Sequence, residues 1–248
     1  MPTIAKNNVH ELYAELRPRL AADPLFSGCG NLEQMDRYMA RLPDTVEALF
    51  GETLQGDAEA YRYAGVLLAA ELVRRFAASQ IFTHDGPLRV DDGEVLFYRG
   101  DLRVAGDLVL GDQAVVVVAG DLDVEGNVIG GAWDYSMLGV AGAMTARNVM
   151  TMGELLAGQR VAVSDAAYFY RNDYTAVAPA IRARVLVEND RLNAFSKISA
   201  DEQIAELLSE SRPERLQHAA SLLGLGHVTG AEDLERELRR RLTVAVPA

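Results

Sequence analysis

A short unit recurs in the middle of the chain and constrains the fold more than any other feature. Its two clear copies begin at Gly100-Asp101-Leu102 and Gly120-Asp121-Leu122, and each reaches a second glycine six residues later. Decayed copies begin at Gly142 and Gly158, so the anchoring glycines lie 20, 22 and 16 residues apart. Repetition near this period is typical of a solenoid, in which one coil buries its apolar face only by stacking on its neighbours.

The inward-facing positions of the unit also recur six residues apart, as in the pairs Leu102/Leu108 and Leu122/Val128. A six-residue face in a coil of about 20 residues is what a three-sided parallel β-helix requires. Apolar side chains then point inward, and charged neighbours such as Arg103 point outward. We therefore predict an α+β protein with a central parallel β-helix (a β-solenoid) flanked by α-helical segments.

The predicted boundaries are residues 1–80 for a helical N-terminal segment, 81–187 for the solenoid and 188–248 for a helical C-terminal segment. Apolar residues from Val9 to Leu20 follow helical spacing, and Asn31 is a candidate helix cap. Ser199 and Thr229 each stand three residues before a Glu, the spacing of a capping box, and predict helix starts. Further helix starts are predicted at Asp44, Asp57 and Pro213. Helices at both ends are expected to cover strand edges that would otherwise invite polymerisation.

Negative charge is concentrated on the first half of the predicted solenoid. The chain has a net charge of −12, and residues 85–134 contain eleven acidic and three basic residues, a balance of −8. Such a field repels nucleic acid and favours a basic protein partner. Asp121, Asp123 and Glu125 are the acidic residues that we expect to contact this partner. The alternative is that turn aspartates satisfy their own backbone and keep the protein soluble.

Two aromatic clusters are further candidates for partner binding, because Tyr and Trp bury a large area and keep a polar tip. The first contains Trp133, Asp134 and Tyr135; the second contains Tyr168, Tyr170, Asp173 and Tyr174. The alternative is that these residues fill solenoid corners or seat the terminal helices.

The pattern of reactive residues argues against catalysis, and we predict a protein that is not an enzyme. The four histidines lie outside the repeats, at positions 10, 84, 218 and 227, although hexapeptide-type transferases require a histidine base. Cys29 is the only cysteine, which excludes an internal disulfide and a thiolate metal cage. The Gly-Asp steps do not follow the nine-residue spacing of calcium-binding solenoids. No cofactor and no metal are therefore expected.

The longest apolar runs are far shorter than the roughly 20 residues of a membrane helix, and no signal peptide is visible. We therefore expect a cytoplasmic protein with no membrane partner.

The repeat block, roughly residues 95–175, resembles a loose group of bacterial β-helix proteins. The resemblance lies in Gly100-Asp101-Leu102, in Gly120-Asp121-Leu122 and in Asp134-Tyr135-Ser136 leading into Gly142. The third copy departs from this pattern, because Ala143 and Met144 replace Asp and Leu. Some members of the group carry a polymer-forming, bactofilin-like label, and others are immunity proteins beside polymorphic or type VI-delivered toxins.

The resemblance implies a structural solenoid and transfers no site residue. It suggests an immunity protein that neutralises a cognate basic toxin or effector domain by occluding it, as a monomer or a small homo-oligomer. The alternatives are a bactofilin-like scaffold and a degenerate hexapeptide-repeat transferase.

Overall fold

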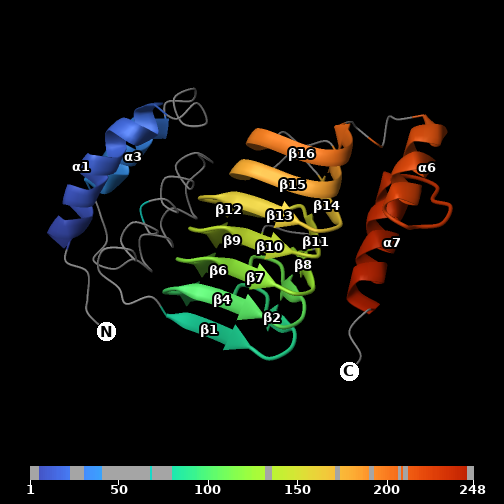
Figure 1. The fold of residues 1–248 in the computed structure, drawn as a ribbon, viewed down its shortest axis with the longest axis horizontal. Helices are drawn as coiled ribbons and strands as arrows, with labels where there is room; N and C mark the ends of the chain where they lie inside the picture. Colours follow the sequence, from blue (N-terminus) through green and yellow to red (C-terminus); the bar gives the residue numbers. More distant parts are fainter. Residues whose placement is uncertain are drawn as a thin grey trace.

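The computed structural model describes residues 6–22, 31–40, 68, 80–131, 136–170, 174–189, 193–205, 208 and 212–244. In this part of the chain, 16 strands pair in parallel into one sheet that winds about an axis as a β-solenoid of three faces. The described helices of the N-terminal segment lie on one side of the solenoid, and those of the C-terminal segment lie on the other (Figure 1). The predicted fold class is confirmed.

The three faces differ in the strands that form them. Face A contains β1 (Ile81–His84), β4 (Asp101–Val104), β7 (Leu122–Val124), β10 (Met144–Ala146) and β13 (Arg160–Val163). Face B contains β2 (Leu88–Val90), β5 (Leu108–Leu110), β8 (Asn127–Ile129), β11 (Asn148–Thr151) and β14 (Ala166–Tyr170). Face C contains β3 (Val95–Tyr98), β6 (Val115–Val118), β9 (Met137–Val140) and β12 (Glu154–Ala157).

The last two strands are long and bend around the corners of the solenoid. β15 (Ala176–Asn189) pairs in turn with β12, β13 and β14, and so contributes to all three faces. β16 (Ala194–Ala205) follows it in register from Val177 to Glu188. We number the coils by their segment on face A: β1, β4, β7, β10 and β13 are coils 1 to 5, and β15 and β16 supply coils 6 and 7.

The helix predicted to start at Ser199 is wrong, and so is the solenoid boundary at residue 187, because strand structure continues to Ala205. Ser199 and Glu202 have the spacing of a helix cap, but Ile198 and Ile204 continue the ladders begun by Ile181 and Val187. Pairing with the preceding coil therefore overrides the local helix signal. Most of β16 is exposed, and Ile198 retains 39% of its surface.

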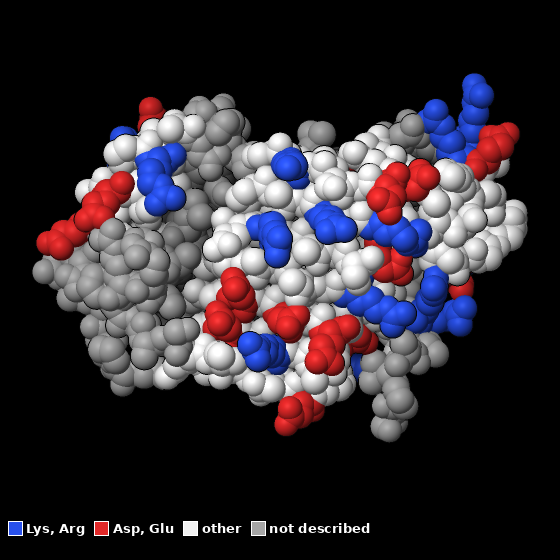
Figure 2. Space-filling view, viewed as in Figure 1, with Lys and Arg blue, Asp and Glu red and all other residues white. Residues whose placement is uncertain are grey.

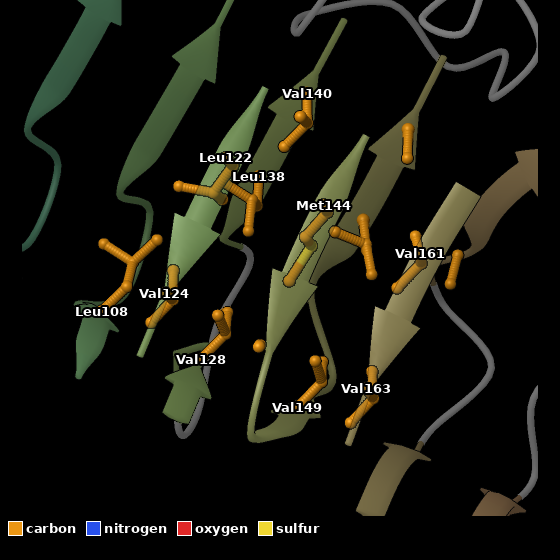
Figure 3. Packing of buried hydrophobic residues seen from close by; sticks show 14 of the residues in the cluster. Leu108, Leu122, Val124, Val128, Leu138, Val140, Met144, Val149, Val161 and Val163 are labelled. Carbon is orange, nitrogen blue, oxygen red and sulfur yellow. The ribbon is translucent and has the colours of Figure 1, made fainter. Parts of the chain in front are cut away.

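The interior of the solenoid is a continuous stack of aliphatic side chains. On face A, Leu102, Leu122 and Met144 are successive register partners, and each is at most 1% exposed. Figure 3 shows these ladders meeting those of the other faces in the lumen. Each coil has too little apolar area to fold alone, so the stacking itself supplies the core.

The Gly-Asp steps form the solenoid corners by a specific contact between coils. The Asp101 carboxylate accepts a hydrogen bond from the Asp121 N–H of the next coil at 2.9 Å. Its oxygen lies 2.2 Å from where a Cβ on Gly120 would stand, so the corner is open only to glycine. Asp107 with Gly126, and Asp121 with Gly142, repeat this contact. The repeat therefore encodes a carboxylate ladder that joins successive coils.

This ladder predicts different effects for two substitutions of Asp101. Asp101→Ala removes the acceptor of the Asp121 N–H and should lower the free energy of unfolding by about 1 kcal/mol. Asp101→Asn keeps an oxygen acceptor and should lower it by less than half as much. Urea denaturation followed by circular dichroism measures both, and equal losses would contradict the acceptor role.

The N-terminal helices are α1 (Lys6–Ala22) and α3 (Asn31–Met39), as the sequence predicts. Pro18 lies inside α1 and does not end it. The two helices are joined by Asp36, which accepts hydrogen bonds from Arg17 and from the Tyr13 hydroxyl at 3.0 Å. The Arg17 guanidinium lowers the pKa of Asp36. The predicted helix starts at Asp44 and Asp57 lie outside the described residues.

The C-terminal helices α6 (Pro213–Leu222) and α7 (Ala231–Val244) pack along face B instead of over the end of the solenoid. Leu234, Leu238 and Leu242 of α7 are buried in one cluster with Met150 and Val185 of the sheet. The predicted helix starts near Pro213 and Thr229 are confirmed. Their expected role as covers of the strand edge is not, because β16 stays exposed.

Polar contacts tie α7 to coils that are not neighbours. The Asn127 amide of β8 donates to the Leu242 carbonyl at 3.2 Å. Arg239 donates to the Gly130 carbonyl at 2.9 Å and to the Tyr170 hydroxyl at 2.8 Å. Helix α7 therefore contacts both coil 3 and coil 5.

Candidate interaction surface

Face A is the face whose outward side chains meet solvent along the described solenoid. Its strands alternate buried and accessible residues, as in β4 and β7, where Arg103 and Asp123 are exposed. The central strands of the other two faces, β8, β11 and β14 on face B and β6, β9 and β12 on face C, are buried on both sides. A partner that approaches the middle of the solenoid therefore meets face A.

The three acidic residues predicted to contact a partner lie in coil 3 of face A. All three are exposed. The Asp121 carboxylate accepts a hydrogen bond from the Ala143 N–H at 2.7 Å, and Asp123 accepts one from the Thr145 hydroxyl. Glu125 follows at the corner toward face B. Two of the three carboxylates are therefore held in place by the next coil, so little side-chain entropy remains to be lost on binding.

The later coils of face A are basic, which the sequence analysis did not predict. Arg160, Arg182 and Lys197 are exposed on coils 5, 6 and 7, and within the described chain none of them forms an ion pair. Figure 2 shows mainly acidic side chains over the lower coils, with basic charge among them, and basic side chains over the upper coils of this face. Face A is therefore electrostatically divided along the solenoid axis.

A signal for the basic half was present in the sequence but was obscured by the decay of the repeat. Arg182 stands in register with Asp123 three coils earlier, but the spacing between register partners is irregular: Asp123, Thr145, Ala162 and Arg182 lie 22, 17 and 20 residues apart. No anchoring glycine follows Gly158 in the remaining coils, up to Ala205. Without the strand register, the arginines cannot be assigned to the same face.

A groove of about 690 Å³ runs along the corner between faces A and B. Small side chains, among them Ala146 and Ala183, form its floor, and Arg147 and Arg182 lie on its rim. Arg184 is also on the rim, where it pairs with Asp165 at 2.7 Å and donates to the Leu222 carbonyl at 3.0 Å. The groove thus lies at the edge of face A and is lined by both acidic and basic side chains.

Tyr168 and Tyr170 of the second aromatic cluster do not lie on the surface. They are 0% and 2% exposed and pack beneath α7. The Tyr168 hydroxyl donates to Glu235 at 3.3 Å, and burial raises the pKa of this tyrosine well above its usual value. Their prediction as partner contacts is wrong, because they seat a terminal helix, which was the alternative from sequence.

The remaining aromatic candidates are placed only in part. Tyr174 is half-buried before β15. Trp133, Asp134, Tyr135 and Asp173 lie outside the described residues.

Reactive groups in the described ranges show no assembled centre. His84 contacts the Gly86 carbonyl at 3.4 Å, and His227 contacts Gln217 at 3.1 Å. Among these residues, no three His, Cys, Asp or Glu side chains are grouped to hold a metal ion. None of the helices that the structure describes is both long and apolar enough to cross a membrane.

Comparisons of the chain with protein-family models, with curated proteins and with solved structures found no match. Face A is therefore the feature from which a function can be inferred.

Proposed function

We propose that this protein is a non-catalytic binding module that docks a basic protein through the acidic half of face A. The observation that carries the proposal is that Asp123 is exposed on β7 and Asp121 at the corner that precedes β7, and that each is fixed by a hydrogen bond from the next coil. Preorganised charges of one sign favour an oppositely charged surface and speed its association. Glu125 extends this surface toward the corner.

In its finer form, the proposal is that the protein acts as a cytoplasmic immunity protein. The partner is then a basic toxin or effector domain, and the mechanism is occlusion by a rigid surface. The net charge of −12 supports a basic partner. The resemblance of the repeat to solenoids that stand beside toxins supports the biological setting.

The test compares two variants with the same change in net charge. The first variant combines Asp121→Asn, Asp123→Asn and Glu125→Gln, and so removes three negative charges. Residues 121 and 123 keep a side-chain oxygen that can accept the hydrogen bond from the next coil. We expect the Kd for the basic partner to rise by about threefold to about 150-fold, because exposed pairs contribute roughly 0.2–1 kcal/mol each. Calorimetry with the purified partner measures this change.

The control is Glu11→Gln, Glu214→Gln and Glu232→Gln, which removes three exposed charges from the terminal helices. It should leave the Kd within about twofold, apart from the long-range effect of net charge. Equal weakening by both variants would contradict a site on face A.

A bactofilin-like scaffold is the second candidate, and the exposed β16 edge supports it. An open solenoid end presents unpaired backbone groups to a further strand. Electron microscopy of the purified protein distinguishes the two functions, because a scaffold forms filaments and a binding module does not.

A further inference from the structure

The outward residues of face A form a column that carries charges of both signs. Strand register places one residue of each coil in this middle column: Thr83, Arg103, Asp123, Thr145, Ala162, Arg182 and Ser199. The midpoint between Asp123 and Arg182 falls between Thr145 and Ala162. Asp123 lies one coil before this pair, and Arg182 lies one coil after it.

We propose that face A binds face A of a second copy of this chain, related by a two-fold axis that passes between Thr145 and Ala162. The rotation places Asp123 of each copy opposite Arg182 of the other, because the two residues are equally far from the axis. It also places Thr145 opposite Ala162, so the side chains at the centre are small enough for the sheets to approach. An interface of this kind is isologous and closes as a dimer.

A second copy fits this column better than a polyanion does. Arg182 is exposed and makes no ion pair within the described chain, so it is available to a carboxylate. However, the acidic coil 3 lies on the same face and the whole chain carries −12, which repels nucleic acid and other long polyanions. A second copy of this chain presents Asp123 and Arg182 at the separation that this column requires. The two residues are three strand spacings apart, which is about 14 Å.

The size of the face indicates a weak dimer. Seven strands are about 29 Å high, and four residues of strand are about 13 Å wide, so face A measures roughly 400 Å². Two such faces bury about 800 Å², which is less than the roughly 1,200 Å² of stable complexes. We therefore expect a reversible dimer with a Kd in the micromolar range. A basic partner that binds the same acidic residues would displace the second copy.

The decisive experiment exchanges the two charges of the column. Asp123→Arg places like charges opposite each other in a dimer of that variant, and Arg182→Asp does the same. Each variant alone should be monomeric by sedimentation equilibrium under conditions where the unaltered chain forms dimers. An equimolar mixture restores both opposite pairs, so it should form a 1:1 heterodimer with a Kd within about threefold of the original.

Two further variants test the register. Arg103→Asp changes a charge in the same column that faces Ser199 of the other copy, so it should leave the Kd within about twofold. Arg160→Glu changes a charge that faces the neutral Ala143 of the other copy, because a two-fold axis between two opposed faces runs along the strands and preserves the position along each strand. That variant should therefore also leave the Kd within about twofold.

The proposal is overturned if the unaltered chain stays monomeric at about 0.5 mM, or if the mixed variants do not associate. It is also overturned if either exchange variant alone dimerises as well as the unaltered chain. Near-ultraviolet circular dichroism establishes that each variant is folded. Because the experiment uses this chain alone, its result is independent of whether a basic partner exists.

Discussion

Gly120→Ala is expected to lower the free energy of unfolding by about 3 kcal/mol, a large loss for the addition of one methyl group. The new Cβ would stand 2.2 Å from the Asp101 carboxylate and 2.6 Å from the Gly100 carbonyl carbon. The coils must separate at this corner, which also stretches the hydrogen bond from the Asp121 N–H. Chemical denaturation measures the loss.

Gly226→Ala is the matched control, because no atom lies within 4 Å of the position where its Cβ would stand. This substitution should change the free energy of unfolding by less than about 0.5 kcal/mol. A similar loss for both glycines would show that the cost does not come from contact between coils.

Phe169→Ala should have the largest effect of the substitutions considered, a loss of about 4 kcal/mol. Phe169 is fully buried in the lumen, and its ring lies 5.8 Å from that of Phe195 in the next coil. Removing it leaves a cavity that a rigid stack of strands cannot close. Thermal unfolding by calorimetry measures the change.

Phe82→Ala provides the comparison at the other end of the solenoid. Phe82 is only half-buried and contacts Tyr98 edge-on at 5.4 Å, so its loss should cost about 1–2 kcal/mol. If both substitutions cost the same, the lumen around Phe169 has collapsed to fill the cavity.

Sequence patterns predicted the fold where the repeat remains regular. Gly100 and Gly120 mark corners that only glycine can occupy, and Leu102 and Leu122 mark the inward ladder. Beyond coil 4 these markers decay, and the Ser199–Glu202 spacing predicts a helix start inside what is strand β16. Register is set by pairing with the preceding coil, which is information that a local pattern does not contain.

The candidate surface was predicted in part for the same reason. Charge counting identified Asp121, Asp123 and Glu125, because acidic residues are dense in the regular coils. It did not identify Arg160 and Arg182, which belong to the same face only through strand register. Whether a tyrosine faces a partner or a terminal helix is set by tertiary packing, so the sequence left the two roles of Tyr168 open.

The position of α7 has a consequence for how the protein melts. Stacked repeats contact only their neighbours, so an array of this kind can fray from an open end one coil at a time. Helix α7 bonds to Asn127 in coil 3 and to Tyr170 in coil 5, and its Glu235 accepts a bond from Asn189 in coil 6 at 3.2 Å. Such a longitudinal brace couples distant coils, so unfolding from coil 3 onward becomes a single all-or-none transition and the exposed end does not unzip by itself.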